Sequence, residues 1–337
     1  MIEKFNLAAL YPELLLLVMT MVIAMLDLFV KSPRRTLTYV LSLSTMAVVA
    51  AMQAHDASSG TTVYSFGNMV VSDPMGNWLK CFSTLAVFVT LVYGRPYAAD
   101  RDMLKHGGEL FTLGLFALVG MYVMISGNNF LVLYLGVELL ALSSYALVAL
   151  RRDNATASEA AMKYFVLGAL GSGFLLYGMS MLYGVTGSLD LIEIFKAVAD
   201  PRINHLIMAF GLVFIMAGLA FKLGVVPFHM WVPDVYQGAP TAVTGFMAAA
   251  TKVAAFGAIL RIYYVAFANA EWHWKPVLIL IALVTMVFGS VVAIAQRDVK
   301  RMLAYSSIAH AGFLLAGVIA LSKSGLDASI FYLFAYG

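Results

Sequence analysis

Cysteine is almost absent from this sequence, with Cys81 the only one among 337 residues. One cysteine excludes a disulfide within the chain, a cysteine-rich zinc site and an iron–sulfur cluster held by the chain's own thiolates. Charged residues are also scarce, at 12% against about 25% in an average soluble domain. Hydrophobic residues make up 62% of the chain, more than a water-soluble core encloses. The sequence therefore predicts a protein whose solvent is lipid, and the small net charge of +3 gives no indication of nucleic-acid binding.

The apolar runs are long enough to cross a bilayer, because about 20 helical residues span its hydrocarbon core. We expect an all-α polytopic membrane protein with ten full spans, and an external loop over residues 55–72. An eleventh span begins near Asp327 and has only about 11 residues before Gly337, too few to cross, so we expect the polypeptide to continue. The expected spans are 8–30, 36–54, 74–94, 109–126, 129–150, 159–183, 205–230, 240–268, 276–296 and 302–322.

The loop cations alternate between two sides of the expected bundle, and the richer side is predicted to be cytoplasmic. That side holds eleven cations: Lys31, Arg34, Arg35, Arg95, Arg101, Lys105, Arg151, Arg152, Arg297, Lys300 and Arg301. The opposite side holds five: Lys4, Lys196, Arg202, Lys275 and Lys323. We therefore expect a multi-pass membrane protein with its N-terminus on the side opposite the cytoplasm.

Five lysine and arginine residues fall inside expected spans, and Glu138 is the clearest buried acid; a charge there costs about 2.5–3.5 kcal/mol on insertion scales. Charged residues occur in membrane spans when they are paired with another charge, are hydrated, or serve a function. Lys80 and Arg261 are expected to reach a membrane interface with their long side chains. The others are Glu138, Lys163, Lys222 and Lys252. Burial disfavours the charged form of a lysine, so a buried lysine is able to release and rebind a proton.

Helix rise gives the depth of these groups in the membrane. Glu138 lies about 20 Å before Arg151, and Lys222 lies about 17 Å before Pro233. Lys252 lies about 18 Å after Pro240, and His310 lies about 14 Å after Arg301. We therefore expect these four groups to lie at a similar depth, near the bilayer centre. Lys163 is shallower; it either pairs with Glu138 or extends to the cytoplasmic surface.

The seventh expected span carries signals of a broken helix. Gly224 and Pro227 follow Lys222 directly, and proline removes a helical hydrogen bond. Discontinuous helices mark ion sites in many transporters, although a packing kink would also explain the proline. His229 follows the break; it and His310 either take part in proton transfer or serve as neutral hydrogen-bonded residues.

Four segments carry a family resemblance. The run GLAFKLGVVPFHMWVPDVYQGAPTAVTGFMAAATKVAAFG (218–257) resembles the signature of the antiporter-like subunits of respiratory NADH dehydrogenase. Within it, the motif PDVYQGAPT favours subunit N. LYLGVELLALSSYALVAL (133–150), EAAMKYF (159–165) and QRDVKRMLAYSSIAHAGF (296–313) match the same family. The resemblance implies an antiporter-like bundle with inverted repeats. We expect N-terminal helices over 1–107 and a proton-translocating domain over 108–337.

By this resemblance the proton path contains Glu138, Lys163, Lys222, Lys252, His229 and His310, with the helix break at Gly224 and Pro227. The resemblance also implies a subunit of a translocase that couples electron transfer from NADH to quinone with proton pumping. FMN, iron–sulfur clusters and quinone would belong to other subunits, and no cofactor or metal to this chain. Expected partners are membrane lipid, M-like and K-like membrane subunits and the lateral helix of an L-like subunit, but no nucleic acid.

Two alternatives remain open. One is a subunit of a Mrp-type cation/proton antiporter or of a membrane-bound hydrogenase, which share the lysine and glutamate residues. The other is a membrane scaffold that supports assembly without transport; unused buried charges would be costly in such a protein.

Overall fold

The computed structural model describes residues 6–105 and 107–337, so Lys4, one of the cations that predict orientation, lies outside the described residues. The chain forms two compact units. Unit 1 comprises residues 1–162 and 238–257, and unit 2 comprises residues 163–237 and 258–337. Helices α6 (Ala155–Thr186) and α10 (Thr241–Arg261) each run from one unit into the other.

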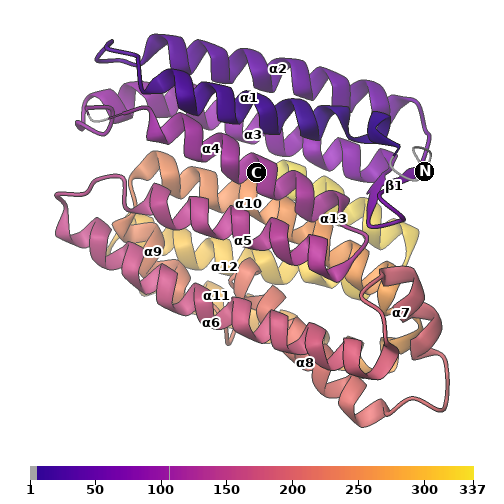
Figure 1. Cartoon of the computed structure of the whole chain (residues 1–337). Coiled ribbons are helices and arrows are strands. Elements are labelled where there is room, and N and C mark those ends of the chain that lie inside the picture. The colour runs from indigo at the N-terminus through magenta and orange to yellow at the C-terminus, as the bar shows by residue number, and fades with distance from the viewer. Residues whose placement is uncertain (1–5, 106) are drawn as a thin grey trace. The chain divides into compact units, whose positions relative to one another are not determined.

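Unit 1 is built from antiparallel membrane-length helices (Figure 1). Helices α1, α2, α3 and α4 pack in sequence, α1 also contacts α4, and α5 packs against α4. Helix α3 starts where the sequence predicts, because the Asp73 carboxylate accepts the Gly76 N–H at 2.7 Å and Pro74 occupies the first turn. The helices are α1 (Tyr11–Asp27), α2 (Thr36–Ser58), α3 (Pro74–Ala99), α4 (Glu109–Ser126) and α5 (Phe130–Val148).

The expected loop over 55–72 is more ordered than predicted. It contains the end of α2 and an antiparallel hairpin of β1 (Val63–Ser65) and β2 (Val70–Ser72). Gly67 and Asn68 turn the chain with positive φ angles of 62° and 72°. The strands have three residues each, too short for their alternation to be recognised in the sequence.

Helices α4 and α5 approach each other closely through glycine. A Cβ on Gly120 would lie 2.6 Å from the Leu140 nitrogen, and one on Gly136 would lie 2.6 Å from the Met124 nitrogen. Small residues allow this close packing in lipid, where helices gain little from the hydrophobic effect against each other.

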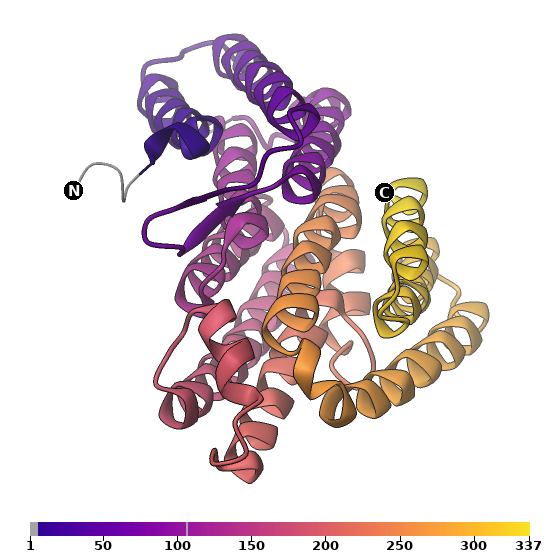
Figure 2. The ribbon, with the colours of Figure 1, turned by 90° about the vertical axis from the view of Figure 1, so that its right-hand side faces the viewer.

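Unit 2 contains most of α6 and the helices that follow it, with the exception of the part of α10 in unit 1. Helices α11, α12 and α13 pack side by side in chain order (Figure 2). The elements are α7 (Leu191–Val198), α8 (His205–Leu223), α9 (Trp231–Gly238), a π-helical turn (Ile262–Ala266), α11 (Glu271–Ile294), α12 (Val299–Ile319) and α13 (Lys323–Tyr336).

Helix α7 was not expected from the sequence. It has eight residues, too few to cross a membrane. Its Asp190 cap accepts the N–H groups of Ile192 and Glu193, and Leu191 and Ile194 are buried. It is thus a short amphipathic helix packed against the π-helical turn.

Among the described residues, nine helices have the length and apolar composition of a membrane span. The first expected span corresponds to α1, which has 17 residues and a length of about 26 Å. The all-α polytopic class is confirmed. The count of ten spans and the domain boundary near residue 108 stay predictions.

Candidate proton-transfer site around a broken helix

Helix α8 ends at Leu223, inside the seventh expected span. Gly224 has φ +72°, and its N–H and that of Val225 bond the carbonyls of Phe221 and Ala220, which is the Schellman arrangement. A Cβ on Gly224 would lie 2.5 Å from Val232 Cγ2, so only glycine fits. Pro227 follows in the irregular segment before α9. The predicted break is therefore present.

The polar backbone groups released by the break have partners from neighbouring elements. The Val226 N–H donates to the hydroxyl of Thr285 on α11 at 3.1 Å. The indole N–H of Trp231 on α9 donates to the Phe221 carbonyl at 2.9 Å. Irregular backbone at membrane depth requires such compensation, because lipid offers no hydrogen bonds. These two side chains therefore stabilise the break.

Lys222 and His229 lie on either side of the break. Lys222 is half-buried in the last turn of α8. The His229 ring packs edge-on against Phe288, with centroids 4.9 Å apart. Its Nδ1 atom is buried and has no hydrogen-bond partner among the described residues. The 17 Å depth predicted for Lys222 assumed a helix continuing to Pro233; that assumption is wrong, because α8 ends one residue after the lysine.

An ionic cluster lies on α9 after the break. The Asp234 carboxylate accepts from Lys163 Nζ at 2.9 Å through one oxygen and from Arg301 Nη1 at 2.6 Å through the other. Arg301 also donates to the Gln237 side-chain oxygen at 3.1 Å. Asp234 is 34% exposed and Lys163 is 44% exposed, so the cluster is open to its surroundings. We call Lys163, Asp234, Gln237 and Arg301 the entrance cluster.

His310 lies on α12 opposite α13. Its Nδ1 atom is 2.5 Å from the Tyr332 hydroxyl. The ring of Tyr336, one turn farther along α13, has its centroid 4.6 Å from that of His310. Neither tyrosine was predicted as part of the site, because both lie in the short final segment.

Two predicted path residues belong to unit 1. Glu138 is half-buried at the middle of α5, and its Oε1 atom is enclosed without a hydrogen-bond partner among the described residues. Lys252 is only 3% exposed near the middle of α10. The Lys163–Glu138 pair and the common depth of four groups stay predictions.

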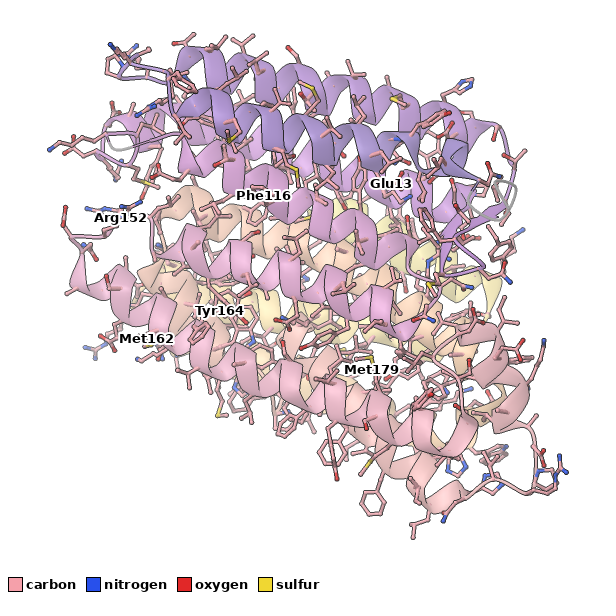
Figure 3. All side chains as sticks on the ribbon, in the orientation of Figure 1. Glu13, Phe116, Arg152, Met162, Tyr164 and Met179 are labelled. Atoms are coloured by element: carbon pink, nitrogen blue, oxygen red, sulfur yellow. The ribbon has the colours of Figure 1, made fainter. Side chains whose placement is uncertain are left out.

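Lys80 and Arg261 do not reach an interface as expected. Both are enclosed by protein, at 1% and 4% exposure. Lys80 Nζ on α3 lies 2.5 Å from the Glu13 carboxylate on α1, and Ser126 donates to the same carboxylate oxygen at 3.3 Å. Figure 3 places Glu13 and Arg152 toward opposite ends of the unit 1 helices.

The sequence contains a signal that would have identified this pair. Glu13 and Lys80 lie five and six residues into the first and third expected spans, which enter the membrane from the same side. Both are therefore about 8–9 Å deep.

No group of three or more histidine, cysteine, aspartate or glutamate side chains within the described ranges could hold a metal ion. The chemistry offered by the described side chains is acid–base chemistry from lysine, histidine, carboxylate and hydroxyl groups. These groups are suited to proton transfer.

Residues 127–337 match the family described as NADH:quinone oxidoreductase/Mrp antiporter, transmembrane. The chain is 59% identical to NADH-quinone oxidoreductase subunit N of Polaromonas naphthalenivorans (strain CJ2), with 100% of this chain and 69% of that relative aligned. It is 52% identical to subunit N of Herminiimonas arsenicoxydans, with 99% of this chain and 70% of that relative covered.

Solved structures have the same fold. A chain of respiratory complex I from Thermus thermophilus matches with a TM-score of 0.77 and 32% identity, over 96% of this chain and 67% of that chain. A chain of the Mrp complex from Dietzia sp. DQ12-45-1b matches with a TM-score of 0.83 over 98% of this chain and 62% of that chain, at 23% identity, which shows the fold alone. The chain therefore belongs to the subunit N family of NADH-quinone oxidoreductase, within the transmembrane family that this enzyme shares with Mrp antiporters.

Proposed function

We propose that this chain is the antiporter-like subunit N of a proton-translocating NADH:quinone oxidoreductase. The observation that carries the proposal is the broken helix at Lys222, in a region that matches the family model. The chain would move protons across the membrane while other subunits carry electrons from NADH to quinone. It is thus a subunit of a translocase, with FMN, iron–sulfur clusters and quinone bound elsewhere in the complex.

The proposed path starts at the entrance cluster, where Asp234 holds Lys163 at a partly exposed surface. It continues to Lys222 and His229 at the break, and further through Lys252, Glu138 and His310. The enclosed Nδ1 of His229 and Oε1 of Glu138 support this path, because each is a buried polar atom that could bind water. Charged groups at membrane depth are costly unless they serve such a purpose.

The proposed setting is a bacterial inner membrane with the N-terminus in the periplasm, as the loop cations favour. The partners would be M-like and K-like membrane subunits, the lateral helix of an L-like subunit, and lipid. Many large apolar side chains on α11 are exposed, as lipid or subunit contact requires.

Lys222→Ala and Lys222→Arg in the assembled complex test the proposal. Alanine removes the proton-exchanging group, and arginine keeps the charge without releasing a proton. Both variants should lower proton pumping and coupled NADH:quinone turnover, while Lys196→Ala, at an exposed lysine paired with nearby Glu193, should leave both unchanged. Glu138→Ala should behave like Lys222→Ala.

Pumping at the wild-type proton-to-electron ratio in Lys222→Arg would show that Lys222 exchanges no proton. Normal turnover and pumping in a strain without this chain would contradict the proposal as a whole. If cation/proton exchange were lost without any change in NADH:quinone activity, the Mrp-type alternative would be correct. Loss of assembly alone, with normal pumping in every assembled variant, would indicate a scaffold.

A further inference from the structure

Two tyrosines on α13 surround His310 on α12. Tyr332 and Tyr336 are four residues apart, so they lie on one face of their helix. The Tyr332 hydroxyl is 2.5 Å from His310 Nδ1, and the Tyr336 ring packs on the imidazole. The histidine is therefore bonded by one tyrosine and packed against the other (Figure 2 shows α13 beside α12).

Ser307 lies one turn before His310 on the same face of α12. Its hydroxyl is hydrogen-bonded to Tyr336 and to Tyr236 on α9. Ser307 and Tyr236 are almost completely buried. A hydroxyl both donates and accepts, so these three side chains form a continuous hydrogen-bonded chain from α9 to α13.

The chain of hydroxyls starts on α9, the helix that carries two members of the entrance cluster. Tyr236 lies between Asp234 and Gln237 on α9. Arg301, which binds both of those residues, also donates to the hydroxyl of Tyr305 on α12. The hydroxyl chain therefore starts on the same short helix as Asp234 and Gln237, and it leads to α13 without adding a buried charge.

Phenylalanine would fill the same volume as each tyrosine without hydroxyls to satisfy. Buried hydroxyls are tolerated at little net cost when all are hydrogen-bonded, and they are costly when one partner is missing. A chain of hydroxyls that starts on the helix of an ionic cluster and ends at a tyrosine packed on a histidine supplies the alternating donors and acceptors that a proton relay requires.

We propose that Tyr236, Ser307 and Tyr336 form a hydroxyl relay for protons between α9 and α13, and that Tyr332 is a positioning residue that holds the His310 ring at its end. In each transfer an oxygen gains one O–H bond from the α9 side and gives its original proton to the next oxygen. Every O–H bond broken is matched by one formed, and no oxidant or reductant is needed. This inference rests on the proposed function.

Ser307→Ala and Tyr336→Phe in the assembled complex interrupt the relay with almost no change in volume. We expect each to lower the rate of proton pumping roughly tenfold or more, the lower range of general acid–base effects. The solvent deuterium isotope effect on pumping should change as well, which a purely structural role would not cause. Tyr332→Phe should lower the pumping rate less, because it frees the His310 ring without breaking the relay.

Tyr264→Phe is the matched control, because its hydroxyl donates to a backbone carbonyl, that of Val318 at 3.3 Å. It should pump as the wild type does. Ser307→Thr keeps a hydroxyl and should retain pumping if hydroxyl chemistry matters; equal loss in Ser307→Ala and Ser307→Thr would overturn the relay. Wild-type pumping in Ser307→Ala and Tyr336→Phe would also overturn it, while loss in Lys222→Ala would still support the proposed function.

Discussion

Trp231 donates its indole N–H to the Phe221 carbonyl at 2.9 Å, and so joins the two helices on either side of the break. Its ring also stacks on Tyr164, with centroids 4.6 Å apart and planes 14° from parallel. The aromatic contact holds α9 on α6, and the hydrogen bond holds it on the end of α8. The broken conformation of the chain is thus held by a specific hydrogen bond and a specific ring contact.

Trp231→Phe should destabilise the protein by about 1–3 kcal/mol, because the Phe221 carbonyl would lose its buried donor. Part of the stacking on Tyr164 would remain. Thermal unfolding of the complex in detergent, followed by release of this chain, measures the effect. Trp272→Phe is the control, since Trp272 is 86% exposed, and it should change little. Equal stability of the two variants would contradict the role of the indole bond.

Gly224→Ala should be destabilising through two separate effects. A side chain at φ +72° costs about 1–2 kcal/mol, and the new Cβ would also collide with Val232. Gly187→Ala separates these effects, because Gly187 has φ +71° and open space around it. The unfolding temperature should therefore fall more for Gly224→Ala. If both fall equally, the contact with Val232 is not limiting.

Asp234→Asn should change stability little, since partly exposed ion pairs contribute about 0–1 kcal/mol. Its effect should appear in proton uptake, because Lys163 and Arg301 would face each other without a carboxylate. A loss of about 1 kcal/mol of favourable interaction corresponds to a rate reduced about fivefold. Pumping measured in closed vesicles checks this. Glu193→Gln, which breaks the exposed pair with Lys196, should leave pumping intact.

Lys80→Ala should destabilise the protein by about 3–5 kcal/mol, because it leaves the Glu13 carboxylate buried and unpaired. The double variant Glu13→Leu with Lys80→Met should be close to neutral, since apolar residues replace both charges. The amount of assembled complex and its unfolding temperature distinguish the two. If the double variant is as unstable as Lys80→Ala, the ion pair stabilises the protein by more than the cost of burying its two charges.

The sequence predicted the features that depend on local chemistry. Long apolar runs predicted the helices, and Gly224 and Pro227 predicted the break, because backbone conformation and missing hydrogen bonds are properties of nearby residues. Partners distant in sequence were missed. Lys80 and Glu13 are 67 residues apart, and Arg301 and Asp234 are also 67 apart, so their contacts depend on which helices pack together.

The hydroxyl and indole groups of the site were also missed. Ser307, Thr285 and Trp231 are ordinary components of a membrane helix bundle when only their sequence positions are known. Their roles follow from which backbone atom or ring each one meets. The charged residues were easier to identify, because a charge in an apolar run is unusual by itself.

The end of α8 at Leu223 has an electrostatic consequence for the lysine one residue before it. The last carbonyl groups of a helix carry about half a negative charge in aggregate, and this field falls off within one turn. Lys222 lies in that turn, so the helix terminus favours a cation there without any carboxylate. In a continuous helix the same lysine would lie far from a helix terminus and outside this field. The break therefore acts as a fixed partial counter-charge that is part of the backbone and cannot be titrated.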